Sequence, residues 1–441
     1  MDYTGGTAEA DHLCVLVHGL WGNPNHMANI AKSLRAQHGA DKVHILVAKR
    51  NSGSFTYDGI ERGGERVCAE IEEELRTIKA NGGAIAKLSV VGYSLGGLVA
   101  RYAVGLLHAK GLLDDLECMN FTTFATPHLG VRTPLRGWHN HIWNVLGART
   151  LSMSGRQLFT IDEFRDTGRP LLAVLSDPNS IFMTGLRRFR RRTLYTNIVN
   201  DRSAVYYTTG IAKTDPYANI SKLRLNYLDG YEDVILDPRC PVAPRGKSSP
   251  PPLSLASVSA DAAQFLRRVP LALAIAVLVP IGVVAFLANS CIQTVRSSSR
   301  IRLHEKGLAG VAVDDYRRFP LWINEIRTEV EEAYEALNSL QDHEYLGSET
   351  DEDDEAGAGV PARKLLSRER RMSAPAQPTL ALAPDQFQMV QDLDSLGWHK
   401  YPVYIHQDRH SHAAIIVRWD KKTFAEGRVV LKHWLKEEFL V

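Results

Sequence analysis

The segment from Lys87 to Ala100 constrains the fold more than any other stretch of the chain. Leu88 to Val91 is a short apolar run typical of a buried strand, and apolar residues recur at helical spacing from Leu95 to Val104. Between them lies Gly92-Tyr93-Ser94-Leu95-Gly96, which matches Gly-x-Ser-x-Gly. A strand, a tight turn and a helix are the context of a nucleophile elbow, where a strained turn lifts a serine hydroxyl clear of a sheet. The pattern predicts that Ser94 is a nucleophile.

The pentapeptide alone is weak evidence, because a chain of 441 residues matches it by chance roughly one time in seven. A glycine-rich turn with an exposed serine is the plain alternative. The context favours the elbow, since side chains at Gly92 and Gly96 would crowd the turn. A second matching element also lies upstream.

That upstream element is a strand, Leu13 to Val17, which runs into His18-Gly19-Leu20-Trp21-Gly22. A strand that ends in His-Gly supplies half of an oxyanion hole in many enzymes that use a serine elbow. We expect the backbone N–H groups of Leu20 and Leu95 to form this hole, with His18 and Gly19 supporting the turn.

Strands and helices alternate around these two elements, which favours an α/β fold. A mostly parallel sheet with helices on both faces is expected, and its active site belongs at the carboxyl ends of the strands. The expected elements are a helix at Asn25–Gln37, a strand at Lys42–Ala48, a helix at Gly64–Ala80 and a strand at Met119–Phe124.

An acidic partner for the serine is expected after a later strand, because this fold orders its triad as Ser, then Asp, then His. Asp201 lies just past the strand Thr193–Val199 and is the favoured candidate. An Asp that ends a strand is also a common turn former. Three other aspartates remain alternatives: Asp215, Asp229 and Asp233.

A general base is expected on the loop after the last strand, Trp398–Ile405. His412 directly precedes an apolar run to Arg418 that is expected to start a final helix. The alternatives are His406 and His410, and His128 is the first candidate if the base lies before the apolar run described below.

Val131 to Arg192 carries tryptophans and other apolar residues among basic ones, and two interpretations are equally open. The segment forms either a lid over the elbow or core helices. Its basic run, Arg187 to Arg192, fits anionic lipid headgroups or, slightly better, a solvated face.

Composition excludes some functions. The net charge of +2 gives no reason to expect nucleic-acid binding. The spacing of the cysteines fits neither a zinc site nor a disulfide framework, and the amino terminus lacks signal-peptide features. Free thiols in a reducing compartment are therefore expected. The five cysteines are Cys14, Cys68, Cys118, Cys240 and Cys291.

Val269 to Ala288 is an apolar run of about 20 residues, long enough for a bilayer core. A buried core helix is the alternative. Because the run lies between Asp201 and His412, a single crossing would separate the base from the nucleophile. A hairpin, or a helix in the membrane interface, is preferred, with Pro280 bending the chain. An amphipathic helix is expected at Leu321–Leu340.

These features divide the chain into five expected regions. They are an α/β core at 1–238 (with the lid interpretation for 131–192), a linker at 239–256, a membrane-associating region at 257–345, a disordered acidic and basic region at 346–385, and the rest of the core at 386–441.

Together the motifs resemble the fungal and eukaryotic family of "putative serine esterases" (DUF676, lipase-like), which includes a lipid-droplet phospholipase and monoglyceride lipases of yeast. The resemblance covers Leu13 to about Asp201 and then Trp398 to Arg418. It is carried by His18-Gly19-Leu20-Trp21-Gly22, Gly92-Tyr93-Ser94-Leu95-Gly96-Gly97, Thr126-Pro127-His128-Leu129-Gly130, Asn200-Asp201-Arg202 and His412-Ala413-Ala414-Ile415.

The resemblance implies an α/β-hydrolase fold and hydrolysis of lipid esters, acylglycerols or phospholipids, by Ser94, Asp201 and His412. No cofactor or metal is expected. The expected surroundings are a lipid-droplet or endoplasmic-reticulum surface, with the catalytic domain facing the cytosol. The rival interpretation is a catalytically silent protein of the same fold that acts as a membrane scaffold.

Overall fold

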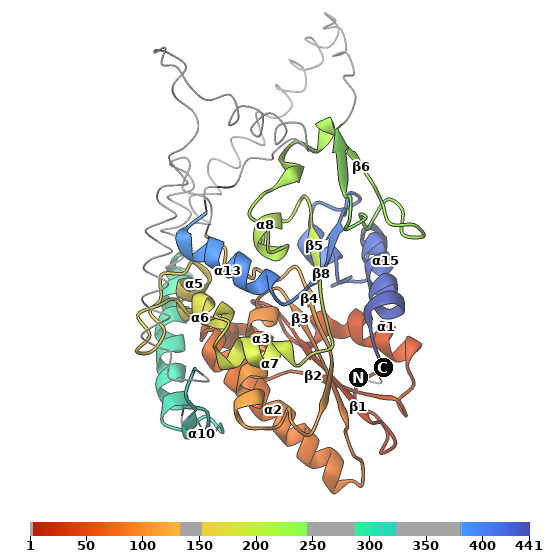
Figure 1. Cartoon of the computed structure of the whole chain (residues 1–441). Helices are drawn as coiled ribbons and strands as arrows, with labels where there is room; N and C mark the ends of the chain where they lie inside the picture. Colours follow the sequence, from red (N-terminus) through yellow and green to blue (C-terminus); the bar gives the residue numbers. More distant parts are fainter. Residues whose placement is uncertain are drawn as a thin grey trace, which may run out of the picture.

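A six-stranded parallel sheet forms the centre of the computed structural model, which describes residues 3–132, 152–244, 287–311, 313–317, 319–322, 380 and 382–441 (Figure 1). The strand order is β2-β1-β3-β4-β5-β8, and each neighbouring pair is parallel. The strands are β1 (His12–Val17), β2 (Val43–Val47), β3 (Lys87–Tyr93), β4 (Glu117–Phe124), β5 (Arg191–Asn197) and β8 (His399–Val403). The predicted α/β-hydrolase fold class is therefore confirmed.

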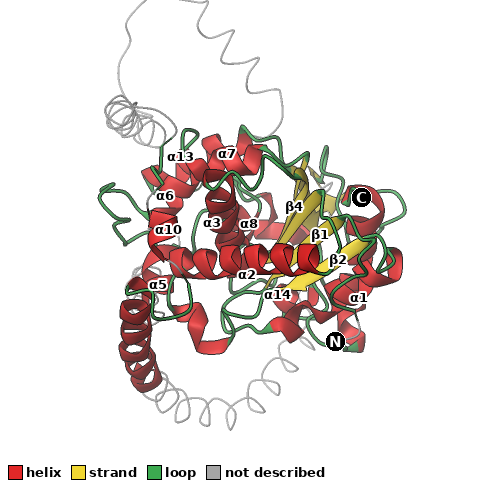
Figure 2. Ribbon diagram, turned by 90° about the horizontal axis from the view of Figure 1, so that it is seen from below, coloured by secondary structure: helices red, strands yellow, loops and turns green. Residues whose placement is uncertain are grey.

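Side chains that alternate along each strand enter two separate cores, one on each face of the sheet. Along β1, Leu13 and Val15 pack into one core, whereas Cys14 and Leu16 pack into the other. The helices α2 (Ile60–Ala80), α3 (Leu95–Ala109) and α7 (Ile181–Arg187) cover the first face. The helices α1 (Ala28–Gln37, labelled in Figure 2) and α15 (Ala425–His433, labelled in Figure 1) cover the second. Both faces are covered, as a parallel sheet requires.

Short elements complete the described part of the chain. The remaining α-helices are α5 (Ser152–Leu158), α6 (Leu171–Ser176), α8 (Tyr206–Thr209), α10 (Val313–Arg317), α13 (Pro384–Asp394) and α14 (Ser411–Ala414). The 3₁₀-helices are η1 (Pro24–Met27), η2 (Gly53–Tyr57), η3 (Pro216–Lys222) and η4 (Lys422–Phe424), and η5 (Trp434–Glu438) is a π-helix. A separate antiparallel pair joins β6 (Leu223–Leu225) to β7 (Val242–Pro244), at the start of the stretch predicted to be a linker.

The final predicted helix is wrong in its extent. The apolar run after His412 forms only the short α14, and the chain turns at Val417, whose φ is 52°. Asn29 donates a hydrogen bond to the Val417 carbonyl, and Ile415 and Ile416 are fully buried. The run is apolar because it fills the second core, where tertiary packing outweighs helical propensity.

The described part of Val131–Arg192 packs into the first core. Phe159, Leu172 and Phe182 are almost fully buried, and α7 lies along α3. Residues 133–151 lie outside the described residues. The arginines from Arg187 to Arg192 bind local partners near the amino end of β5, which is the edge of the sheet opposite Ser94. These partners are Pro178, Asp114, Glu117, Glu437 and Phe189.

A helix over residues 287–305 packs against the hydrolase core (teal in Figure 1). Arg300 binds Asp58 with nitrogen–oxygen distances of 2.8 and 3.1 Å, and Ser297 donates to the same carboxylate at 2.8 Å. His304 and Glu65 form a fully buried pair at 2.6 Å. This helix belongs with the core, although the sequence placed it in the membrane-associating region.

Most of the apolar run lies outside the described residues, since only 287 and 288 of Val269–Ala288 are described. The predicted amphipathic helix is likewise outside, apart from Leu321 and Trp322, as are residues 346–379. Among the helices of the described residues, none combines the length and the apolar character needed to span a bilayer.

We expect the His304–Glu65 pair to protect the amides of the 287–305 helix from hydrogen exchange. His304→Ala leaves the buried Glu65 carboxylate without its hydrogen-bond partner, which costs about 3 kcal/mol. Amides in 287–305 should then exchange with deuterium much faster than in the wild-type chain. Val295→Ala, on the exposed side of the same helix (70% exposed), is the control and should exchange like the wild type. Equal protection in both variants would contradict the proposed anchoring.

Candidate active site

The structure brings Ser94, His412 and Asp201 together in one line of hydrogen bonds. Ser94 Oγ lies 2.9 Å from His412 Nε2, and His412 Nδ1 lies 2.8 Å from Asp201 Oδ2. The three residues follow β3, β8 and β5, so they meet at the carboxyl ends of parallel strands. This is the edge at which parallel α/β sheets place their sites.

Ser94 is held in a strained turn between β3 and α3. Its φ of 55° and ψ of −130° lie outside the regions that a residue with a side chain ordinarily adopts. Two glycines permit this turn. A Cβ on Gly96 would lie 2.2 Å from the Val17 carbonyl oxygen, and a Cβ on Gly19 would lie 2.7 Å from the Cβ of Ser94. The turn therefore requires glycine at both positions.

Asp201 is buried and fully hydrogen-bonded, with its side chain 2% exposed. Oδ1 accepts hydrogen bonds from the backbone N–H groups of Ser203 and Ala204 at 3.0 and 2.9 Å. Oδ2 accepts a hydrogen bond from Asn197 Nδ2 at 2.9 Å. Burial raises the pKa of the Asp201 carboxyl, but the His412 ring and the donated hydrogen bonds outweigh it. The pKa is thus below its usual value, and the carboxylate is charged at neutral pH.

His412 is positioned by residues that sequence analysis did not single out for this role. The hydroxyl of Tyr93 donates to the His412 carbonyl at 2.9 Å, and the two rings lie 5.2 Å apart. Ser411 Oγ donates to the Val199 carbonyl at 2.9 Å, which ties the loop of the base to the end of β5. Tyr93 is the variable residue before the serine in Gly-x-Ser-x-Gly, so its role depends on a contact that spans more than 300 residues.

The loop His18–Gly22 passes directly against Ser94. The position of a Cβ on Gly19 lies 3.2 Å from Ser94 Oγ, so Leu20, the next residue, lies beside the nucleophile. Leu95 is the first residue of α3 and follows the nucleophile directly. His18 is buried, and its Nδ1 lies 3.1 Å from the Gly19 carbonyl oxygen. Burial lowers the pKa of His18, so its ring supports the turn as a neutral group.

The alternative candidates have other partners. His406 pairs with Glu426 at 2.7 Å, and His128 is buried with Nε2 3.1 Å from Thr123 Oγ1. Asp215 accepts the Tyr217 N–H at the start of η3. Within the described residues, no hydrogen bond or ion pair joins these groups to Ser94, and none joins His410, Asp229 or Asp233 to it.

The sheet order, the strained turn at Ser94 and the line from Ser94 to Asp201 are those of the α/β-hydrolase class of proteins. Residues 7–215 match the family described as "Putative serine esterase (DUF676)". The family resemblance expected from the motifs is therefore confirmed.

Two fungal relatives support this assignment. Over 222 residues the chain is 29% identical to "Putative lipase C4A8.10" of Schizosaccharomyces pombe, covering 48% of this chain and 27% of that protein. Over 209 residues it is 31% identical to "Putative lipase ROG1" of Saccharomyces cerevisiae, covering 46% and 29%. The chain thus spans less than a third of the length of these relatives.

One solved structure similar to this chain is an "Alpha/beta hydrolase fold protein from Nakamurella multipartita", at 13% identity and a TM-score of 0.23. It covers 48% of this chain and 85% of that one. A score this low adds nothing to the fold assignment, which rests on the sheet order and the turn at Ser94.

Proposed function

We propose that the protein is a serine lipase or esterase that hydrolyses carboxylic esters of lipids, either acylglycerols or phospholipids. The observation that carries this proposal is the continuous hydrogen-bonded line from Ser94 through His412 to the buried Asp201. A serine that reaches a histidine, itself oriented by a carboxylate, is the arrangement of an activated acyl-transfer nucleophile.

In the acylation step, Ser94 Oγ attacks the ester carbonyl carbon as His412 Nε2 removes the hydroxyl proton. Asp201 accepts a hydrogen bond from Nδ1–H of His412, which fixes the tautomer with a free Nε2 and stabilises the ring once it is charged. Because Asp201 is held by three further donors, it does not have to reorganise when the positive charge forms.

The carbonyl oxygen becomes negative in the tetrahedral intermediate, and we assign its stabilisation to the N–H groups of Leu20 and Leu95. The amino end of α3 adds a favourable field at this position. His412 then protonates the leaving alcohol, and water, activated by the same ring, releases the acid from Ser94. Every step uses groups of this chain.

A membrane or lipid-droplet surface is the proposed location of the substrate, with the active site facing the cytosol. Trp21, which follows Leu20 in the loop against Ser94, is 53% exposed and so places an apolar ring at the edge of the site. The described residues on both sides of the apolar run, up to Pro244 and from Leu287, belong to the same folded body. This arrangement favours a run that enters and leaves the lipid on one side over a single crossing.

The direct test is labelling of the purified full chain with a fluorophosphonate, followed by a screen against acylglycerols and phospholipids. We expect one covalent label on Ser94 and release of fatty acid from at least one lipid class. A fluorophosphonate reacts only with an activated serine, so absence of labelling would favour the scaffold interpretation. Labelling without hydrolysis of any lipid would contradict the lipid substrate but not the mechanism.

A further inference from the structure

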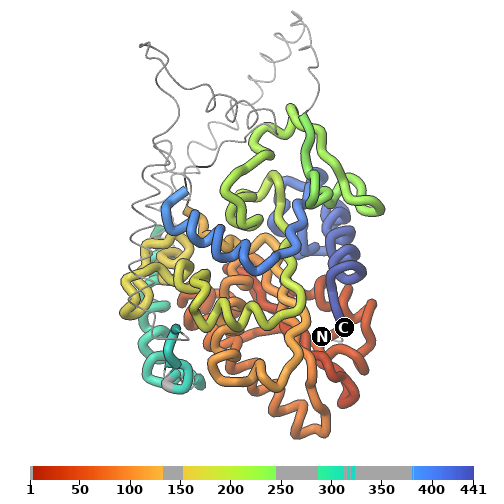
Figure 3. Tube along the Cα trace, viewed as in Figure 1, coloured from red at the N-terminus to blue at the C-terminus, as the bar shows by residue number. Residues whose placement is uncertain are grey.

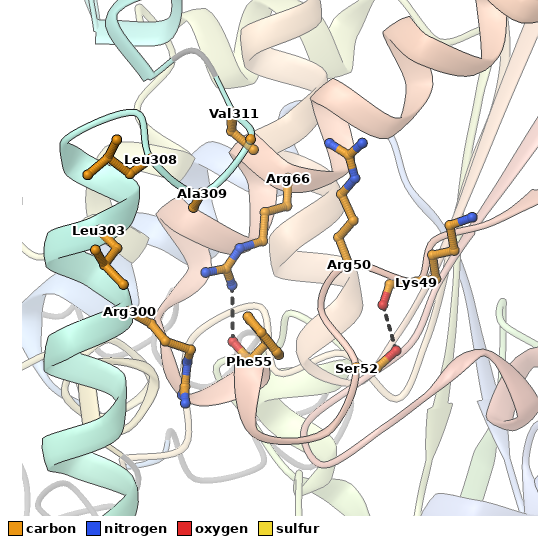
Figure 4. Close-up of a pocket in the computed structure, with 11 residues that line it drawn as sticks. Lys49, Arg50, Ser52, Phe55, Arg66, Arg300, Leu303, Leu308, Ala309 and Val311 are labelled. Atoms are coloured by element: carbon orange, nitrogen blue, oxygen red, sulfur yellow. Dashed lines mark hydrogen bonds between the residues drawn. The ribbon is translucent and has the colours of Figure 1, made fainter.

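A pocket of about 710 Å³ lies between the loop that follows β2 and the 287–311 segment (Figure 4). One side is formed by residues after β2 and by α2, and the other by the helix 287–305 and the turn after it. The pocket is lined by Lys49, Arg50, Ser52, Phe55, Arg66, Arg300, Leu303, Leu308, Ala309, Gly310 and Val311.

Four of the lining side chains are cationic, and none of the lining residues is acidic. Arg66 and Arg300 share one fully buried carboxylate, Asp58, and both guanidiniums lie 5.1 Å from the ring centre of Phe55. Two cations that share one carboxylate leave an excess of positive charge at this wall. Both guanidiniums are held by bonds to Asp58 and to backbone carbonyls, so an anion in the pocket would meet two positive charges in fixed positions.

The other two cations lie on the loop after β2. Arg50 pairs with Glu73, but both side chains are solvent-accessible and such a pair is weak. Lys49 is exposed, and within the described residues it has no side-chain ion pair. A nearby carboxylate, Glu70, accepts the backbone N–H groups of Lys49 and Arg50 instead of their side chains. The ammonium of Lys49 is therefore available to a ligand.

The remaining wall of the pocket is apolar and open to solvent. Leu303 and Leu308 are 48% and 72% exposed, so leucine side chains line the pocket without being covered by the described residues. Phe55, 42% exposed, adds a ring between the two walls. A site that pairs fixed cations with exposed leucines suits an amphiphile better than a small hydrophilic ion.

We propose that this pocket binds the phosphate headgroup of an anionic phospholipid, with the four cations around the phosphate and the leucines against the glycerol and the upper acyl chains. The site is separate from the hydrolytic one and does not depend on turnover. Phe55 belongs to η2, whose neighbouring Thr56 and Tyr57 bind Trp21 at 3.1 and 2.7 Å. A lipid held here would therefore hold the loop beside Ser94 against the lipid surface.

The test is calorimetric binding of dihexanoyl phosphatidic acid, below its micellar concentration, to the full chain carrying Ser94→Ala. This background prevents hydrolysis, so the result does not depend on the proposed activity. Lys49→Ala/Arg50→Ala should weaken binding at least about tenfold, because two cations leave the phosphate. Both residues are solvent-accessible, so the variant is expected to fold.

The matched control is Lys87→Ala/Arg190→Ala. It also removes two cations, in this case ones paired with the exposed carboxylates of Asp11 and Glu117, but at the amino ends of the strands, away from the pocket. The control should bind phosphatidic acid like the parent chain. Inorganic phosphate should compete weakly, and neutral dihexanoylglycerol should not bind at the pocket.

Three results would overturn the proposal. The first is undetectable binding of phosphatidic acid, and the second is equal weakening in the control and pocket variants. The third is binding of inorganic phosphate as tight as that of phosphatidic acid, which would assign the pocket to a soluble anion and remove the role of the leucines.

Discussion

Ser94→Ala should abolish ester hydrolysis while leaving the fold intact. The substitution removes one oxygen from a residue whose Oγ contacts His412, and the remaining Cβ keeps its place between Gly19 and α3. Loss of the nucleophile in a serine hydrolase lowers kcat by about 10⁶-fold. The rate on a short-chain p-nitrophenyl ester measures the effect, and circular dichroism checks the fold.

Ser395→Ala is a suitable control for this experiment. Ser395 is an exposed residue at the end of α13, and within the described residues its hydroxyl donates one local hydrogen bond, to the Asp392 carbonyl. We expect wild-type activity from it. If Ser94→Ala kept a rate near that of the wild type, or if it retained the fluorophosphonate label, Ser94 would not be the nucleophile.

Asp201→Asn should lower kcat by about 10⁴-fold with little change in the structure. Oδ1 of Asp201 accepts two backbone N–H groups, so an asparagine would keep its oxygen there and turn its NH₂ towards His412. His412 Nδ1 would then have to accept, and the proton would move to Nε2. A ring with a proton on Nε2 cannot remove the proton of Ser94. Kinetic measurements across a range of pH give the loss in kcat.

Asp215→Asn tests whether the effect is specific, because Asp215 was an alternative candidate and caps η3 instead. We expect only a small change in its rate. A large loss in Asp215→Asn together with near-normal activity in Asp201→Asn would remove Asp201 from the mechanism.

The parts of this site that local sequence predicted are those set by local geometry. The turn at Ser94 needs glycines because a Cβ on Gly92 or Gly96 would clash with the turn itself or with the end of β1. The Gly-x-Ser-x-Gly pattern can therefore be recognised in the sequence. His412 and Asp201 each follow a strand, and parallel strands bring their carboxyl ends to one edge. The order of the elements was therefore enough to expect a serine, an acid and a base at one edge, although it left other aspartates and histidines as alternatives.

Contacts between segments that are distant in the chain could not be predicted from the sequence in this way. The bond from Tyr93 to His412 and the bond from Asn29 to Val417 join residues more than 300 positions apart. The helix 287–305 is another case, because its attachment depends on Asp58 and Glu65. The neighbouring apolar run, Val269–Ala288, led to the prediction that this helix belongs to a membrane-associating region. In the structure, polar residues of the helix bind Asp58 and Glu65 of the core instead.

The position of β8 has a consequence for the order in which the protein is made. Ser94 and β5 emerge early in synthesis, but the strand that pairs with β5 begins at His399 and the base follows at His412 (Figure 3). Until the ribosome has passed these residues, β5 has an open edge and the serine has no base. The growing chain therefore lacks a complete triad, and we expect any ester hydrolysis to begin only after the sheet has gained β8.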